Sequence, residues 1–382
     1  MGDCLIMKNV KKQTVYVTRP FLPPYKEFEP YIKEIWQSRW LTNDGKFHQE
    51  LEQKLCEYLG VKYISLFTNG TLALITALQA LKITGEVITT PYSFVATTHA
   101  LWWNNIKPIF VDVETDFLNL DPEKIESALT PNTTAILAVH VYGNPCRTEE
   151  IQKIADTYGL KVIYDACHAF GVKQKNISIL NFGDLSILSF HATKIYNTFE
   201  GGAIVCHDEK MKKRIDFLKN FGFADEVTVV APGINAKMNE FQSALGLLQL
   251  KYVDNNIAKN QKIADCYQKN LANIPGLSFL DEPKNIRQNH SYFPIFIDEK
   301  AFGKSRDQVY VHMKKIGMYC RRYFYPLISE FPTYNSLESA NKKILPIALQ
   351  FSRKVLCLPI YPELDQRICQ EIIMEIKKYR DE

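Results

Sequence analysis

The sequence predicts an α/β fold with a large domain, built on a mostly parallel mixed sheet, and a smaller α+β domain at the C-terminal end. From about residue 61 to 206, short β-branched or aromatic runs alternate with amphipathic stretches, which is the pattern of βαβ units. From about 237 to 273 the pattern is helical, and shorter strand and helix candidates follow it. A length of 382 residues leaves room for two or three domains at about 150 residues each. We therefore predict a large domain over 1–250 and a small domain over 251–382.

The strand candidates of the large domain are short apolar runs that end in small or polar residues. In chain order they cover residues 63–67, 86–90, 108–112, 135–139, 161–164, 185–189 and 202–205. Helical stretches follow most of them, and Asp121-Pro122-Glu123 predicts a helix start, with Asp as the N-cap and Pro at the first helical position. Ligands bind at the carboxyl ends of the strands in such sheets, so we expect the polar residues at these ends to form the site.

The smaller domain has strand candidates at 292–297 and 318–320, and helix candidates at about 305–316 and 363–379. No internal repeat, low-complexity tract or flexible linker interrupts the sequence. We therefore expect the two domains to pack together.

The composition is that of a folded protein. Hydrophobic residues make up 46% and charged residues 23%, and a net charge of +4 is too small to predict a nucleic-acid partner. No apolar run approaches the roughly 18 residues of a membrane span, and the N-terminus lacks a signal-peptide core, so we expect a cytoplasmic protein without a membrane partner. The nine cysteines are odd in number and show no C-x-x-C spacing. They predict reduced thiols and no metal site.

The motifs of several other enzyme classes are missing from the sequence. G-x-G-x-x-G and G-x-x-x-x-G-K-[ST] do not occur, which removes the main support for a dinucleotide-binding dehydrogenase and for a P-loop NTPase. G-x-S-x-G and H-E-x-x-H are also absent, which disfavours a serine hydrolase and a zinc peptidase.

Three positions remain as candidates for chemistry. Asn69-Gly70-Thr71 lies between a strand and a helix, where N–H groups and a hydroxyl suit a phosphate; a plain turn with a helix cap is the alternative. Asp165 follows an apolar strand and needs a cationic partner if it is buried, which an ordinary salt bridge would also supply. Lys194 follows another apolar strand and is either a surface residue or an amine that forms a Schiff base.

Together the three positions fit pyridoxal 5′-phosphate. This cofactor needs an amine for its aldehyde, an acid that faces its pyridinium nitrogen and anion donors for its phosphate. The acid keeps the ring nitrogen protonated, which makes the ring an electron sink. The order along the chain, with the phosphate turn first, then the acid and then the lysine 29 residues later (194 − 165), is shared with a large class of such enzymes.

Six segments in combination resemble a known family: 69–74, 90–97, 140–143, 165–169, 189–194 and 200–202. The chain resembles the DegT/DnrJ/StrS-type nucleotide-sugar aminotransferases of the aspartate aminotransferase-like superfamily (PLP fold type I), from Trp40 to Pro362. Within the family, it looks most like the VioA type, the dTDP-4-amino-4,6-dideoxyglucose transaminases. It departs from the usual family pattern at Asn69, Cys167 and Lys237, where Ser, Ala and Arg are common.

The resemblance implies three catalytic roles. Lys194 forms the Schiff base and moves the proton between the substrate carbon and the cofactor, Asp165 pairs with the pyridinium nitrogen, and His168 lies near the phenolic oxygen of the cofactor. It also implies binding roles at the cofactor for Gly70, Thr71, Phe94, Ser189 and Asn235. Of these, Phe94 stacks on the ring, and Asn235 reaches the phosphate of the neighbouring subunit in a homodimer. Substrate contacts are implied for Arg321, Arg322 and Tyr323, because guanidinium groups suit a diphosphate.

The implied reaction converts dTDP-4-dehydro-6-deoxy-D-glucose to dTDP-4-amino-4,6-dideoxy-D-glucose. L-glutamate is the amino donor and becomes 2-oxoglutarate, and the product serves O-antigen, lipopolysaccharide or glycoside synthesis. One alternative is a 3-ketosugar nucleotide aminotransferase; another is a PLP-dependent sugar dehydratase, in which histidine replaces the lysine. A non-catalytic sensor or binding protein with the same fold is the alternative of another class. The presence of Lys194 together with the acid and the phosphate turn favours the aminotransferase.

Overall fold

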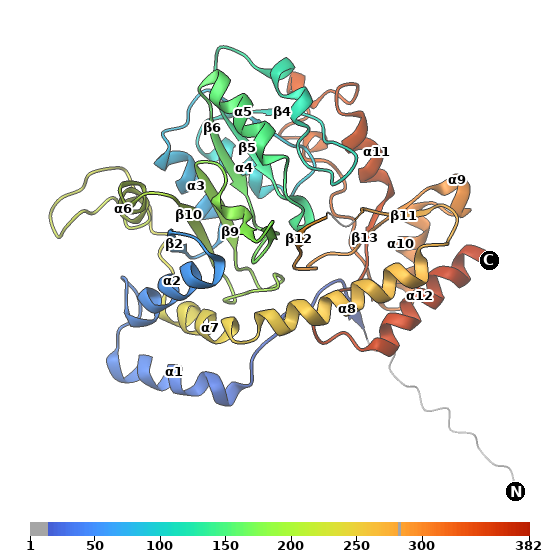
Figure 1. The fold of residues 1–382 in the computed structure, drawn as a ribbon, viewed down its shortest axis with the longest axis horizontal. Coiled ribbons are helices and arrows are strands. Elements are labelled where there is room, and N and C mark those ends of the chain that lie inside the picture. Colours follow the sequence, from blue (N-terminus) through green and yellow to red (C-terminus); the bar gives the residue numbers. More distant parts are fainter. Residues whose placement is uncertain (1–13, 282–283) are drawn as a thin grey trace, which may run out of the picture.

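A seven-stranded sheet lies at the centre of the computed structural model, which describes residues 14–281 and 284–382 (Figure 1). In chain order its strands are β2 (Tyr63–Phe67), β3 (Glu86–Thr89), β4 (Lys107–Phe110), β5 (Thr133–Val139), β6 (Lys161–Asp165), β9 (Leu185–Ser189) and β10 (Gly202–Cys206). Across the sheet their order is β2-β10-β9-β6-β5-β3-β4. The strands pair in parallel except at β10, which is antiparallel to both neighbours. The predicted mixed, mostly parallel sheet is confirmed.

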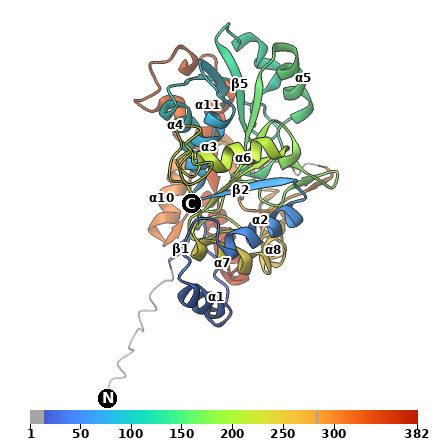
Figure 2. The same cartoon turned by 90° about the vertical axis from the view of Figure 1, so that its left-hand side faces the viewer.

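Helices cover both faces of this sheet because its strands carry apolar side chains on both sides. Along β10, Ala203 and Val205 pack in the cluster formed with α2 (Lys46–Leu59) and α7 (Glu240–Leu250). The alternate residue Ile204 packs on the opposite side, with α3 (Gly70–Ala80), α4 (Ala96–Trp103) and α6 (Glu209–Leu218). Figure 2 shows α3 and α6 on one side of β2, and α2 and α7 on the other.

The C-terminal part of the chain has its own sheet and core. Its antiparallel strands are β11 (Leu277–Phe279), β13 (Pro294–Ile297) and β15 (Val355–Cys357). The helices around them are α8 (Val253–Leu271), α9 (Glu299–Phe302), α10 (Arg306–Lys315), α11 (Pro346–Lys354) and α12 (Gln366–Asp381). The N-terminal strand β1 (Val15–Tyr16) pairs with β14 (Met318–Tyr319) of this part, and α1 (Tyr25–Ser38) then leads to the large sheet. The domain boundary at residue 250 stays a prediction.

Further contacts join the halves of the chain, among them a small sheet and a buried carboxylate. The strands β7 (Lys173–Gln174) and β8 (Ile177–Ser178) form a small sheet with β12 (Ile286–Arg287). The buried carboxylate of Asp112, just after β4, accepts hydrogen bonds from the N–H groups of Ile347 and Ala348 at the start of α11, at 3.0 and 2.8 Å. Backbone groups at a helix start have no partner inside the helix, so this carboxylate fixes α11 to the large sheet.

Two helix predictions need correction. Asp121 caps the next turn as predicted, but the chain forms only two short 3₁₀ turns (Pro122–Lys124 and Glu126–Ala128), because Leu129 is already extended and too few residues remain to form an α-helix. The helical pattern over 237–273 is two helices, α7 and α8, with a break at Lys251 and Tyr252. Of the helical stretches predicted after the strands, the one that follows β5 is α5 (Thr148–Tyr158).

Eight cysteines lie in the described residues and all are free; Cys4 lies outside them. Over residues 14–281 and 284–382, no helix combines the length and the apolar character that crossing a bilayer requires.

A network of charges fixes α2 and α6 to β2, just before the turn at Asn69. Lys212 Nζ lies 2.8 Å from Glu52 Oε2 and 2.7 Å from Asp216 Oδ2, and Lys219 contacts the same two carboxylates. The hydroxyl of Ser65 in β2 also donates to Asp216, at 2.9 Å. Burial acts to raise the pKa of Asp216, but the ammonium groups of Lys219 and Lys212 outweigh it and hold this pKa below its ordinary value.

We expect Lys212→Met to lower the free energy of unfolding by about 3 kcal/mol at pH 7, because it leaves two half-buried carboxylates with one ammonium group. Lys213→Met is the matched control: Lys213 pairs with Glu209 on the exposed face, so the free energy of unfolding should change little. Since the pKa of Asp216 is lowered, its contribution is present above the ordinary carboxyl pKa and lost as pH falls through the lowered value. Urea titrations at pH 7 and below about pH 4 measure both effects, and equal losses in the two variants would contradict the prediction.

Candidate active site

A cavity of about 280 Å³ opens where β6 and β9 end and α3 begins. It brings together most of the residues predicted from the sequence: Gly70, Thr71, Phe94, Asp165, His168, Ser189, Lys194 and Tyr323. These residues come from strand ends and helix starts that are far apart in the sequence, as expected for the carboxyl edge of a parallel sheet.

One end of the cavity has the groups that can bind an anion. Asn69 caps α3 through a hydrogen bond from the Leu72 N–H to its Oδ1 at 2.9 Å, so the first N–H groups of the helix face the cavity end beside Thr71. A Cβ on Gly70 would lie 3.0 Å from Ser189 Cβ, and one on Gly202 would lie 2.6 Å from the Gly70 nitrogen. These two glycines therefore allow β9 and β10 to approach the helix start, which brings the Ser189 hydroxyl to the same place.

Asp165, the last residue of β6, supplies a buried carboxylate. Only 5% of the residue is exposed. Its Oδ2 accepts a hydrogen bond from the hydroxyl of Thr97 at 2.7 Å, and its Oδ1 accepts one from the Cys167 N–H at 3.1 Å. In the part of the chain that the structure describes, no Lys, Arg or His side chain lies within ion-pair distance of it. A buried carboxylate with neutral donors only is a place for a cationic group of a ligand, such as a pyridinium nitrogen.

Lys194 brings a primary amine into the same cavity. Its Nζ donates a hydrogen bond to the hydroxyl oxygen of Tyr292 at 3.0 Å. Burial acts to lower the pKa of Lys194, but contacts with Tyr292, Cys167 and Asp165 outweigh it and raise this pKa above its ordinary value. In this state the group is therefore an ammonium at neutral pH.

His168 is a buried, neutral imidazole. Burial holds its pKa well below the ordinary value. Its Nδ1 accepts a hydrogen bond from the Tyr142 N–H at 3.3 Å, which places the ring hydrogen on Nε2. The ring stacks on Phe324, with 5.7 Å between centroids, and contacts Tyr292. His168 can therefore donate one hydrogen bond from a fixed direction, as a group near a phenolic oxygen must.

Phe94 lies at the rim of the cavity, and the three remaining predicted residues, Asn235, Arg321 and Arg322, do not line it. Phe94 lies at the mouth of the cavity and is 60% exposed. Asn235 is exposed, and its Oδ1 accepts from Lys237 Nζ at 2.9 Å. Arg321 is exposed, and Arg322 pairs with Asp307 at 2.8 Å and stacks on Tyr310 and Tyr325. Of the run 321–323, only Tyr323 lines the cavity.

Three residues of the site were missed in the sequence. Thr97 lies four residues after Ser93, whose hydroxyl contacts it at 2.9 Å, but its partner Asp165 lies 68 residues away. Tyr292 and Phe324 come from the C-terminal part of the chain. The sequence predicts a strand that begins at Tyr292, and it predicts neither a secondary-structure element nor a site role for Phe324. Their roles depend on how the two parts of the chain pack, so no local signal marks them. Among the described residues, no cluster of His, Cys, Asp or Glu could hold a metal ion.

Comparisons with known proteins agree with this geometry. The sequence model of the DegT/DnrJ/EryC1/StrS aminotransferase family matches residues 25–377. A dTDP-4-amino-4,6-dideoxy-D-glucose transaminase of Escherichia coli is 55% identical over 96% of this chain and 98% of its own length. Another transaminase of the same name, from Shigella dysenteriae, is 50% identical over 97% of this chain and 100% of its own length.

The fold agrees as well. The solved structure of DesI in the presence of its TDP-sugar product superposes with a TM-score of 0.91 at 34% identity, covering 97% of this chain and 94% of that one. The predicted aspartate aminotransferase-like fold is confirmed. With the amine, the buried acid and the anion site in one cavity, and a family match over almost its whole length, the chain belongs to the DegT/DnrJ/EryC1/StrS aminotransferase family.

Proposed function

We propose that this aminotransferase uses pyridoxal 5′-phosphate to convert dTDP-4-dehydro-6-deoxy-D-glucose to dTDP-4-amino-4,6-dideoxy-D-glucose, with L-glutamate as the amino donor. The observation that carries the chemistry is the convergence of Lys194, Asp165 and the start of α3 on one cavity. The two bacterial relatives described above support the choice of substrate, because each is named for this product.

The residues of the cavity fit the cofactor at each of its polar groups. When bound, pyridoxal phosphate supplies an aldehyde that takes up the amino group and a ring that withdraws electrons from the reacting carbon. Asp165 holds the ring nitrogen in its protonated state, and Thr97 fixes that carboxylate by its hydrogen bond. His168 donates from Nε2 to the phenolic oxygen.

The remaining residues bind and orient. Gly70, Thr71 and Ser189 hold the phosphate at the start of α3, where N–H groups and hydroxyls converge. Phe94 covers one face of the ring. Lys194 would supply the amine that holds the aldehyde, and its Nζ, when free, would move a proton to and from the substrate carbon.

A second copy of the chain completes the assembly in this proposal. The segment after α6 extends from the body of the molecule in Figure 1 and carries exposed large apolar side chains: Phe221, Phe223, Val227, Val229 and Val230. A monomer rarely exposes such a patch, so we infer that a partner subunit covers it. Asn235, at the end of the same segment, would then reach the phosphate in the partner's site. Among the substrate contacts, Tyr323 lies in the cavity, and Arg321 and Arg322 stay predictions. The cytoplasmic location and the use of the product in O-antigen, lipopolysaccharide or glycoside synthesis are also predictions.

Incubation with L-glutamate and dTDP-4-dehydro-6-deoxy-D-glucose should give a product aminated at C4, read by NMR. The 3-keto isomer should react at least tenfold more slowly, because a keto group one carbon away does not reach the same point above the lysine. An amine at C3 only would move the enzyme to the 3-ketosugar alternative, and loss of the oxygen without amination would indicate a dehydratase. If the protein binds the cofactor but addition of glutamate does not change the absorbance of the bound cofactor, the protein would be a non-catalytic sensor or binding protein.

Asp165→Asn should keep the cofactor bound but slow the half-reaction with glutamate by about a hundredfold, because a buried charge pair is worth roughly 3 kcal/mol. Stopped-flow absorbance measures this rate. Asp156→Asn, on the exposed face of α5, is the control and should react at the wild-type rate. A wild-type rate in Asp165→Asn would show that this carboxylate has a structural role only.

Mixing of two inactive variants tests the shared site. Lys194→Ala removes the amine of its own site, and Asn235→Asp places a repelling charge in the partner's site. In a mixed dimer, one site carries both changes and the other carries neither, so up to about a quarter of wild-type activity should return after exchange, because half the dimers are mixed and each has one intact site of two. No recovery in proven heterodimers, or a fully active monomer by sedimentation, would contradict the shared site.

A further inference from the structure

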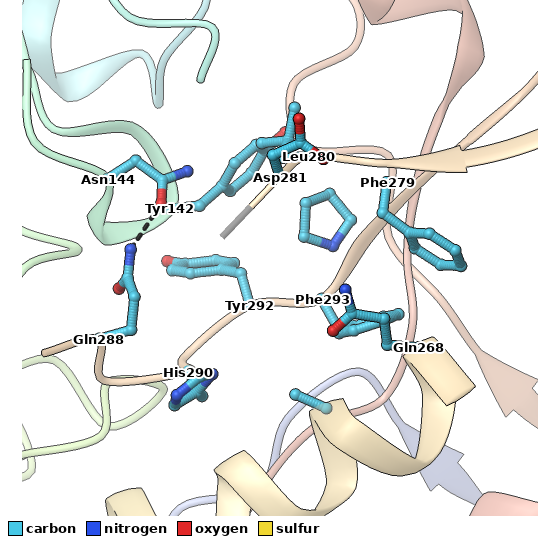
Figure 3. Close-up of a pocket in the computed structure, with 12 residues that line it drawn as sticks. Tyr142, Asn144, Gln268, Phe279, Leu280, Asp281, Gln288, His290, Tyr292 and Phe293 are labelled. Carbon is cyan, nitrogen blue, oxygen red and sulfur yellow. Dashed lines mark hydrogen bonds between the residues drawn. The ribbon is translucent and has the colours of Figure 1, made fainter. Parts of the chain in front are cut away.

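Tyr292 separates two cavities. It lies between β12 and β13, in a segment that comes from the C-terminal part of the chain, and it lines the cofactor cavity together with Lys194. Its other side faces a second cavity of about 80 Å³ that Tyr142, Phe279 and Gln288 also line. Figure 3 shows this second cavity, with the ring of Tyr292 next to that of Tyr142. The ring is thus a wall of the active site that the large sheet does not supply.

The ring of Tyr292 is held from several directions. Its centroid lies 5.6 Å from that of Tyr142, 4.9 Å from that of His168 and 6.0 Å from that of Tyr323. A ring packed among three others has few positions to adopt, so its hydroxyl has a defined place. That place is 3.0 Å from Lys194 Nζ.

We propose that Tyr292 is a positioning residue, whose hydroxyl holds the amino group of Lys194 whenever that group is not bonded to the cofactor. The inference rests on the role of Lys194 proposed above. An ammonium donates to the phenolic oxygen, and a neutral amine accepts the phenolic hydrogen, so the contact persists in both protonation states. Lysine has a long flexible side chain, and every transamination frees its amine for part of the cycle. Holding the amine next to the reacting carbon keeps it ready to carry the proton.

The electrostatic surroundings of Lys194 agree with this role. The titratable groups that face it are Asp165, Cys167, His168, Tyr292 and Tyr323. Burial lowers the pKa of Lys194, and among the groups that raise it the contact with Tyr292 contributes most. Removal of the hydroxyl should therefore lower this pKa, and the neutral amine should form at a lower pH.

The first experiment uses the cofactor-free protein. The rate at which it takes up pyridoxal phosphate, followed by absorbance, rises with pH as the lysine loses its proton. We expect the midpoint of this curve to lie at a lower pH in Tyr292→Phe than in the wild type and to stay in place in Tyr142→Phe. Tyr142 is the matched control because it belongs to the same aromatic group, but its hydroxyl contacts Tyr92 at 2.8 Å and the carbonyl of Tyr323. Tyr292→Met, a second variant without the hydroxyl, should show the same fall if Tyr292→Phe does not fold.

The second experiment uses the loaded enzyme. In Tyr292→Phe, kcat with glutamate should fall at least about tenfold while KM changes less than about threefold, because the hydroxyl acts on the lysine and not on the donor. Tyr292→His should recover part of kcat, since an imidazole can also donate and accept a hydrogen bond. Midpoints and kcat in Tyr292→Phe equal to those of Tyr142→Phe would overturn the proposal.

Borohydride reduction and peptide mapping separate this proposal from the proposed function. Cofactor attached at Lys194 in the wild type and in Tyr292→Phe keeps the proposed role of the lysine, so that the midpoint and kcat decide on Tyr292 alone. Cofactor attached to another residue would overturn the role of Lys194 and the inference with it.

Discussion

The site depends on one physical constraint, which is that the carboxylate of Asp165 is buried. Asp165 ends a central strand of the sheet, and among the described residues it accepts hydrogen bonds from the Thr97 hydroxyl and the Cys167 N–H. A buried anion with neutral partners is costly, and a cationic ring nitrogen offsets this cost. Asp165, His168 and Lys194 line the same cavity, so in the proposed function the carboxylate would meet the ring nitrogen of the cofactor.

The parallel sheet makes this arrangement possible by bringing strand ends to one edge. The helix start at Gly70 approaches Ser189 of β9 closely because a glycine stands at this point and at Gly202. The charges of Glu52, Lys212 and Asp216 hold the helices on both sides of β2, which leads into the same turn. The turn that begins α3 therefore follows a strand that is anchored to two helices, so the donors proposed to bind the phosphate would already be in place.

The C-terminal part of the chain completes what the sheet begins. Tyr292, Tyr323 and Phe324 line the cavity together with the strand ends, and Phe324 stacks on His168. The carboxylate of Asp112 binds the start of α11, which belongs to this part, and so attaches this part to the large sheet. Two residues that are adjacent in the sequence have different surroundings here: Tyr323 lines the cavity, whereas Arg322 forms an ion pair with Asp307.

The sequence by itself determined the alternating strands and helices, the turn at Asn69, and the positions of Asp165 and Lys194, because each of these depends on a run of neighbouring residues. Predictions from the sequence were wrong or missing where neighbouring residues do not determine the structure. The helix expected after Asp121 is two short turns. Nothing in the sequence around Tyr292 indicated its contact with Lys194, 98 residues away. Only the tertiary structure decided these contacts. The physical reason is that strand, cap and turn propensities act over a few residues, whereas a hydrogen bond across a cavity depends on how two packed halves of the chain meet.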